Sequence, residues 1–156
     1  YGMQVEWGTL ESLARTGAVD VWYLFPLSGV TRQLALEECN LDESKQRALD
    51  RVLGTPDWRQ AFYEEGRNGD LFGGPVAVGR HADSGAIESW VTNRLKTIFP
   101  VVVGPEVLRR GHAGRAHGGP RLFALYFLAS TNSKKAQALS RRIATGVLTK
   151  LRRDQA

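Results

Sequence analysis

The stretch that decides the fold is Val19 to Phe25, VDVWYLF, which is followed by Pro26. Both alternating sets of positions in it are apolar or aromatic, apart from Asp20. A strand with two apolar faces is typical of a parallel sheet that helices cover on both sides. The stretch therefore predicts a buried strand of an α/β sheet.

The segments around this strand alternate between helical and strand patterns. Spacing of apolar residues predicts helices over 9–15, 29–37, 42–53, 58–65, 84–98 and 133–152, and an antiparallel hairpin of strands 101–108 and 121–130. The apolar face of the last helix is expected to comprise Ala136, Leu139, Ile143, Val147 and Leu151. We therefore expect a single α/β domain over 1–156, incomplete at its N-terminus, with 38–83 as a helical insertion or lid. Such a chain should self-associate as a homo-oligomer or expose an apolar sheet edge.

Composition narrows the class of protein. The chain has 156 residues, of which 42% are hydrophobic and 24% charged, as in an ordinary globular domain. Its apolar runs are far shorter than the roughly 18 to 20 residues of a membrane-spanning helix. The single cysteine, Cys39, cannot form an intrachain disulfide and is expected to be a buried thiol. We expect a cytoplasmic protein that does not enter a membrane, and no metal site, because His81, His112 and His117 lack neighbouring ligands.

Charge is divided unevenly along the chain. Residues 1–93 hold eight Lys or Arg against fourteen Asp or Glu, a net −6, whereas residues 94–156 hold thirteen against two, a net +11. Clustered cations favour binding to DNA or RNA, because phosphates release counterions when cations neutralise them. The candidate nucleic-acid contacts are Arg109, Arg110, Arg115, Arg121, Lys134 and Lys135. The alternative is that the acidic and basic halves neutralise each other.

The end of the decisive strand is the candidate catalytic site. Ligands of open α/β sheets bind beyond the carboxyl ends of the strands, so Phe25 and Pro26 are placed to touch a substrate. The alternative is that they only end a core strand. Asp20 is the one acid within the strand, and a buried acid must be either paired or functional.

Three segments resemble a known family. They are Val5 to Arg32 with its DVWYLFP run, Gly54-Thr-x-x-Trp58 with the nearby Phe62-Tyr63, and Leu125 to Asn132 before the last helix. Together they resemble the three-Cys-motif partner proteins, which look like class I S-adenosylmethionine-dependent methyltransferases. The resemblance covers nearly the whole chain and implies that the strand ending at Pro26 corresponds to the fourth methyltransferase strand, whose end faces the methyl group and its acceptor.

This resemblance implies a fold, a cofactor and a partner. The fold would be the second half of a Rossmann-like methyltransferase sheet, and the reaction methyl transfer from S-adenosylmethionine to nucleic acid or another macromolecule. The partner would be a radical-type iron–sulfur protein that carries the three cysteines. The glycine-rich segment 66–79 neither follows an apolar strand nor leads directly into a helix, so the cofactor site is expected to be incomplete. The alternative is a non-catalytic module that binds nucleic acid or a partner.

Overall fold

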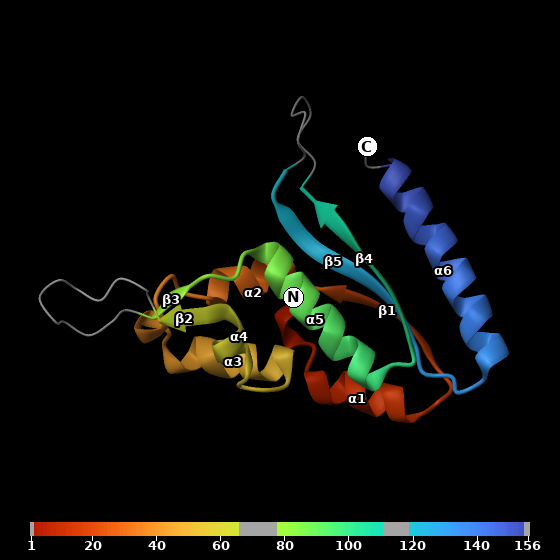
Figure 1. Ribbon diagram of the computed structural model, residues 1–156, viewed down its shortest axis with the longest axis horizontal. Helices are drawn as coiled ribbons and strands as arrows, with labels where there is room; N and C mark the ends of the chain where they lie inside the picture. The colour runs from red at the N-terminus through yellow and green to blue at the C-terminus, as the bar shows by residue number, and fades with distance from the viewer. Residues whose placement is uncertain (1, 66–77, 111–118, 155–156) are drawn as a thin grey trace, which may run out of the picture.

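The protein is built on a three-stranded sheet with helices on both faces (Figure 1). The computed structural model describes residues 2–65, 78–110 and 119–154. The elements are α1 (Trp7–Arg15), β1 (Asp20–Phe25), α2 (Leu27–Gln33), α3 (Glu43–Leu53), α4 (Trp58–Phe62), β2 (Tyr63–Glu65), β3 (Val78–Arg80), α5 (Ser84–Ile98), β4 (Val101–Arg109), β5 (Arg121–Ala129) and α6 (Lys134–Asp154), with short 3-10 turns at Gly2–Gln4 and Glu38–Asn40. The predicted mixed α/β class is confirmed.

The strands of the sheet lie in the order β1-β5-β4, and both pairs are antiparallel. The predicted hairpin of β4 and β5 is therefore confirmed, whereas the parallel setting predicted for β1 is wrong. One face of β1 is also left open, since Trp22 is 46% and Leu24 is 41% exposed. The physical reason is that α6 lies mainly over β4, two strands away. β1 is an edge strand of the sheet, so this open apolar face borders the free edge, and self-association of the chain stays a prediction.

The main hydrophobic core lies on the opposite face of the sheet. Tyr23 and Phe25 of β1 and Tyr126 of β5 belong to it, together with buried side chains from α2 and α5. The segment 38–83 contributes α3 and α4 to the same core through Leu49, Leu53, Trp58 and Phe62. That this segment is an insertion or lid stays a prediction.

Aspartate caps fix the starts of α3 and α5. The Asp42 carboxylate accepts the Lys45 N–H at 2.9 Å before α3, and the Asp83 carboxylate accepts the Ala86 N–H at 2.8 Å before α5. The Ser44 hydroxyl, which donates to Asp42, and the Lys45 amide hold the pKa of Asp42 well below its usual range. The predicted helix 58–65 is shorter than expected, because Tyr63–Glu65 pairs with β3 instead.

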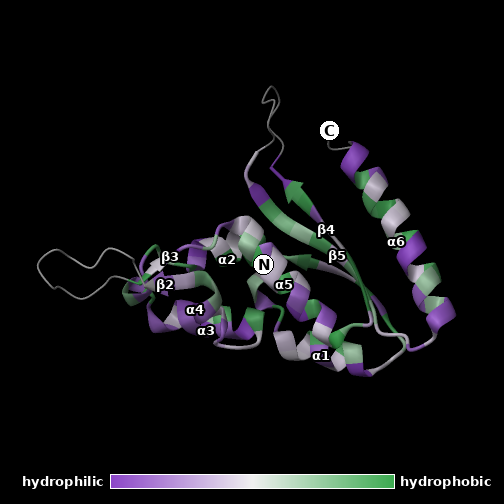
Figure 2. Ribbon diagram, in the orientation of Figure 1, coloured by the Kyte–Doolittle hydropathy of each residue, from purple (hydrophilic) through white to green (hydrophobic). Residues whose placement is uncertain are grey.

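A smaller hydrophobic cluster joins α6 to the other face of the sheet. It contains Val101, Phe127, Ala129 and Ala144, and Leu148 is buried beside Gly104. The predicted apolar face of α6 is wrong, since Leu139, Ile143 and Val147 are exposed. Figure 2 shows that hydrophilic and hydrophobic residues alternate along this helix. Small residues such as Ala144 let the helix approach the sheet closely, whereas the bulkier stripe turns away.

The helices and the single cysteine bear on two further expectations from the sequence. None of the helices in the described ranges combines the length and the apolar composition that crossing a bilayer requires. Cys39 is exposed, which corrects the expectation of a buried thiol. It lies in the 3-10 turn Glu38–Asn40, outside the core.

We predict that Gly54→Ala lowers the free energy of unfolding by about 2–4 kcal/mol. Gly54 ends α3 with φ +74°, and an added Cβ would overlap the ring of Trp7. Urea unfolding followed by circular dichroism measures the change. Gly8→Ala is the control, because a Cβ there meets nothing within 4 Å and alanine favours a helix. Equal stability of the two variants would contradict the Trp7 contact.

Candidate nucleic-acid interface

The three predicted catalytic residues do not form a common site. Asp20 and Phe25 stand at opposite ends of β1, about 17 Å apart for five residues of extended chain. Phe25 and Pro26 are buried, as the alternative of a core strand end requires. Asp20 is exposed and has no ion pair among the described residues, so the prediction that it is a buried acid is wrong. A role of these residues in binding substrate stays a prediction.

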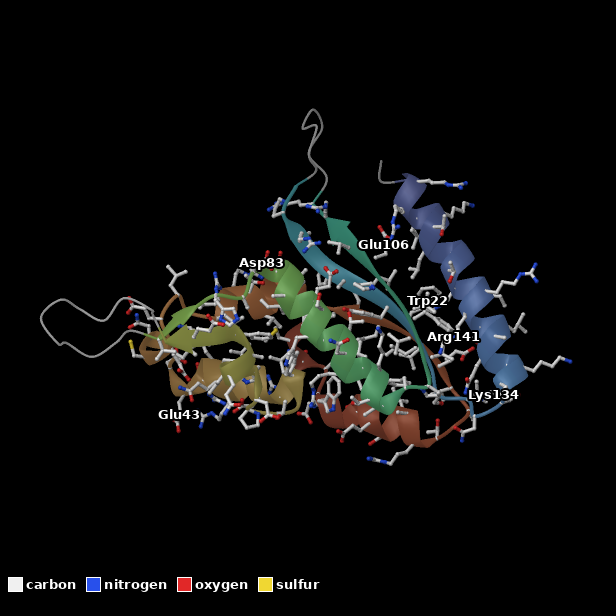
Figure 3. The ribbon with its side chains drawn as sticks, in the orientation of Figure 1. Trp22, Glu43, Asp83, Glu106, Lys134 and Arg141 are labelled. Carbon is white, nitrogen blue, oxygen red and sulfur yellow. The ribbon has the colours of Figure 1, made fainter. Side chains whose placement is uncertain are left out.

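The predicted nucleic-acid contacts separate into two groups. Arg109 and Arg110 are exposed at the end of β4, and Arg121 begins the neighbouring strand β5. Lys134 and Lys135 begin α6, which follows the C-terminal end of β5. They therefore lie at the opposite end of the sheet from Arg109, Arg110 and Arg121, as Figure 3 shows for Lys134. Arg115 falls outside the described residues. The sheet therefore does not bring all six cations to one place.

Arg121 is engaged inside the protein. Its guanidinium lies 3.5 Å from Glu88 and donates to the Ser84 hydroxyl at 3.2 Å. Burial raises the pKa of Glu88, and the charge of Arg121 partly offsets this increase. This ion pair links the start of β5 to α5. Arg121 is thus a weaker candidate for phosphate contact than its exposed neighbours.

The larger set of exposed cations lies along α6. We define the α6 basic surface as five exposed residues that form no ion pair among the described residues: Lys134, Lys135, Arg142, Lys150 and Arg153. Lys135 and Arg153 are 18 residues, or five helical turns, apart and so share one side of the helix, with Arg142 close to the same side. The sequence indicates this basic surface through the lack of any acidic residue between Lys134 and Arg153.

An ion pair holds the C-terminal part of α6 against the sheet. The side chain of Glu106 is 9% exposed, and its Oε2 accepts from Arg152 at 2.8 and 2.9 Å. Between Val103 and Glu106 the register of β4 against β5 shifts by one residue, which turns Glu106 to the face of Val101 and Val103. Figure 3 shows Glu106 on the side of the sheet where α6 lies. The bulge therefore places the one acid that anchors this basic helix.

Two more anchors fix the first half of α6. The Arg141 guanidinium donates to the Pro100 carbonyl, and the Gln137 amide donates to the Thr131 carbonyl at 2.9 Å. These contacts orient the helix so that Arg142 and Lys135 point away from the sheet. Arg141 is for this reason not counted in the α6 basic surface.

The histidines contribute no cluster of ligands in the described ranges. His81 lies 3.9 Å from Glu64 at the surface, and His112 and His117 fall outside the described residues. No three His, Cys, Asp or Glu side chains gather as a metal site in residues 2–65, 78–110 and 119–154.

We predict that Arg152→Leu speeds amide hydrogen exchange in the last turns of α6, because Glu106 then holds a buried charge without its partner. Exchange in β1 and α3 should stay unchanged. Arg153→Leu removes an adjacent cation that forms no ion pair among the described residues, and it should leave exchange in α6 as it is. Equal effects of the two substitutions, measured by mass spectrometry, would contradict the anchoring role of Glu106.

Comparisons of this chain with family models, with curated proteins and with solved structures found no match. The resemblance to three-Cys-motif partner proteins therefore stays a prediction from the segments quoted above.

Proposed function

We propose that this protein binds the phosphate backbone of nucleic acid through the α6 basic surface. The proposal rests on the distribution of ion pairs, which leaves most cations of α6 without an acidic partner in the described residues. In the described residues, the single acid that pairs with α6 is Glu106, and Arg121–Glu88 is the one ion pair between the halves 1–93 and 94–156. The acids of α3 and its cap pair instead with cations of the same half: Asp42–Lys45, Glu43–Arg47 and Asp50–Arg59.

This distribution favours an external polyanion over mutual neutralisation of the two halves. Neutralisation would place the acidic half against α6, but α6 packs on β4 and β5, and its outer side faces away from the sheet. Five cations on one helix repel one another, and phosphates relieve this repulsion while releasing counterions.

The spacing of the cations suits an extended backbone. Lys135 and Arg153 are about 27 Å apart along the helix axis, the length of roughly eight base pairs of duplex. Lysine and arginine on an exposed helix contact phosphates without reading bases, because base recognition needs side chains held in the grooves. We expect binding that depends on salt and little on sequence.

We further infer, from the resemblance alone, that the fold is related to the second half of a Rossmann-like methyltransferase sheet and that the protein acts with an iron–sulfur partner. In that setting the α6 basic surface would hold the nucleic acid that accepts the methyl group. Asp20 lies at the other end of β1 from Phe25 and Pro26, so the three residues do not form one site for the methyl acceptor, and none of them is predicted to bind S-adenosylmethionine. The alternative, a non-catalytic module that binds nucleic acid, requires only the basic surface.

We predict that the triple variant Lys135→Ala, Arg142→Ala, Arg153→Ala weakens binding to duplex and single-stranded DNA. The slope of log affinity against log salt should flatten by about three units, one for each lost phosphate contact. Fluorescence anisotropy with two labelled oligonucleotides of unrelated sequence, at three salt concentrations, measures the slope. Both oligonucleotides should lose affinity equally.

The matched control is the triple variant Arg15→Ala, Arg47→Ala, Arg51→Ala, which removes the same charge from α1 and α3. It should keep the slope of the unmodified protein. The proposal fails if both triple variants lose affinity alike, or if the unmodified protein shows no binding at low salt.

A further inference from the structure

Five exposed apolar side chains lie around one corner of the molecule, between α6 and the open face of β1. We call them the apolar corner: Trp22 and Leu24 on β1, and Leu139, Ile143 and Val147 on α6, the last three 57%, 58% and 42% exposed. Only Val5 and Leu36 are other large hydrophobic residues exposed in the described part of the chain. An apolar patch of this kind on a surface marks a site of association.

The floor of the corner is β1. Trp22 stands opposite Phe127 in the register, and the two rings meet edge to face with centroids 5.1 Å apart. Both therefore lie on the α6 side of the sheet, and Figure 3 shows Trp22 on this side. Because α6 lies mainly over β4, the centre of β1 is two strand spacings, or about 9.6 Å, farther along the sheet. Packed helices are about 8–10 Å apart, so the space over β1 is one helix wide.

The wall of the corner is the exposed stripe of α6. Ile143 and Val147 lie about a third of a turn around the helix from Leu148, which faces the sheet. The direction of this turn follows from the hydrogen bonds of β1. The Ser130 N–H donates to the Val19 carbonyl, so the alternate residues Asp20, Trp22 and Leu24 direct their backbone groups to the free edge.

For L-amino acids, the direction of the strand and the face on which the side chains lie together determine on which side of β1 the free edge is. Because α6 is right-handed and runs parallel to β1, the side chain of Val147 points toward β1. The side chains of Leu139 and Ile143 point partly away from the sheet. The stripe thus faces two directions: along the sheet toward the open space, and away from the sheet. One added helix would cover only the first.

We propose that the apolar corner binds the same corner of a second copy of this chain, so that α6 of each copy fills the space over β1 of the other. A twofold axis parallel to α6 places the two helices side by side between two sheets. Val147 then meets Val147 of the second copy, and Leu139 and Ile143 pack against Trp22 and Leu24 of the second copy. All five side chains become covered by a single symmetric contact.

Two further observations support a second copy as the occupant. Gly146 lies on the outward side of α6 next to Ile143, and a Cβ built there meets nothing within 4 Å, so the missing side chain lets a neighbouring molecule approach the helix closely at this position. Asp20 is exposed on the same face of β1 as Trp22, and the stripe of α6 is flanked by Lys135 and Arg142. The second copy brings these cations to the free edge of β1, where Asp20 lies.

The charge of α6 is compatible with this contact. Lys135, Arg142 and Arg153 share a side of the helix that points away from the twofold axis. The cations of the two copies therefore lie on opposite outer edges of the assembly. This inference goes beyond nucleic-acid binding and does not depend on it.

Sedimentation velocity of the full chain tests the proposal. We expect a species of twice the 17.2 kDa chain mass at tens of micromolar, persisting at high salt because the contact is apolar. Ile143→Lys should weaken the dimer at least tenfold. Thr149→Lys adds the same charge to an exposed position of α6 outside the stripe and should leave the dimer intact.

Two more variants keep the test decisive. Gly146→Gln should weaken the dimer by placing a longer side chain in the contact while raising the melting temperature of the monomer, since glycine weakens a helix interior. In a Cys39→Ser background, Val147→Cys should form an intermolecular disulfide on mild oxidation, and Thr149→Cys should not.

Three results would overturn the proposal. They are a monomer at all concentrations, a dimer that is indifferent to Ile143→Lys, and equal cross-linking of the two cysteine variants. Tryptophan fluorescence that responds to DNA rather than to protein concentration, and that loses this response in Trp22→Phe, would assign the corner to nucleic acid instead. Loss of DNA binding at high salt with the dimer retained separates this inference from the proposed function.

Discussion

Strand β5 is the element on which the rest of the structure depends. It is hydrogen-bonded along both edges, to β1 and β4, and both of its faces are covered. Tyr126 and Leu128 face the main core, while Phe127 and Ala129 face α6. The Tyr126 hydroxyl lies 3.0 Å from the Thr92 hydroxyl and ties α5 to the strand, and burial raises the pKa of Tyr126. A central strand of this kind fixes the two layers relative to each other.

The position of α6 follows from few contacts, and it has consequences for charge. Glu106 is the one acid that reaches this helix in the described residues, and it reaches it only because a bulge turns β4 by one residue. Other cations of the chain are used for structure: Arg94 lies over the rings of Trp7 and Trp90, and Arg80 donates to the Thr31 and Leu34 carbonyls. Of the cations that form no ion pair in the described residues, more lie on α6 than on any other element, and α6 therefore concentrates positive potential on one outer surface.

Closeness of α6 to β4 also explains the apolar corner. Ala144 and Gly104 let the helix and strand approach, and the larger residues Ile143 and Val147 are left to the side. If the bulky stripe faced the sheet, Arg152 would turn away from Glu106 and leave a buried carboxylate without its partner. The observed rotation keeps this ion pair together and leaves the stripe exposed.

Local chemistry was enough to predict several elements from the sequence. Asp83 and Pro100 delimit α5, Asp42 and Gly54 delimit α3, and the glycine-rich segment between two apolar runs predicts the hairpin of β4 and β5. Such signals act over a few residues, because caps and turns satisfy backbone groups close to them in the chain. The division of charge between the two halves is likewise a property of the sequence alone.

What only the tertiary structure decided is which faces are covered. Apolar residues on both sides of β1 are compatible with parallel or antiparallel neighbours, and pairing with β5 over a hundred residues away selected the second. The exposure of Asp20 and Trp22 follows from the placement of α6 over β4. The rotation of α6 depends on Pro100, Thr131 and Glu106, whose positions no helical periodicity encodes. Periodicity reports that a helix has an apolar face, whereas packing against remote elements determines whether that face is buried.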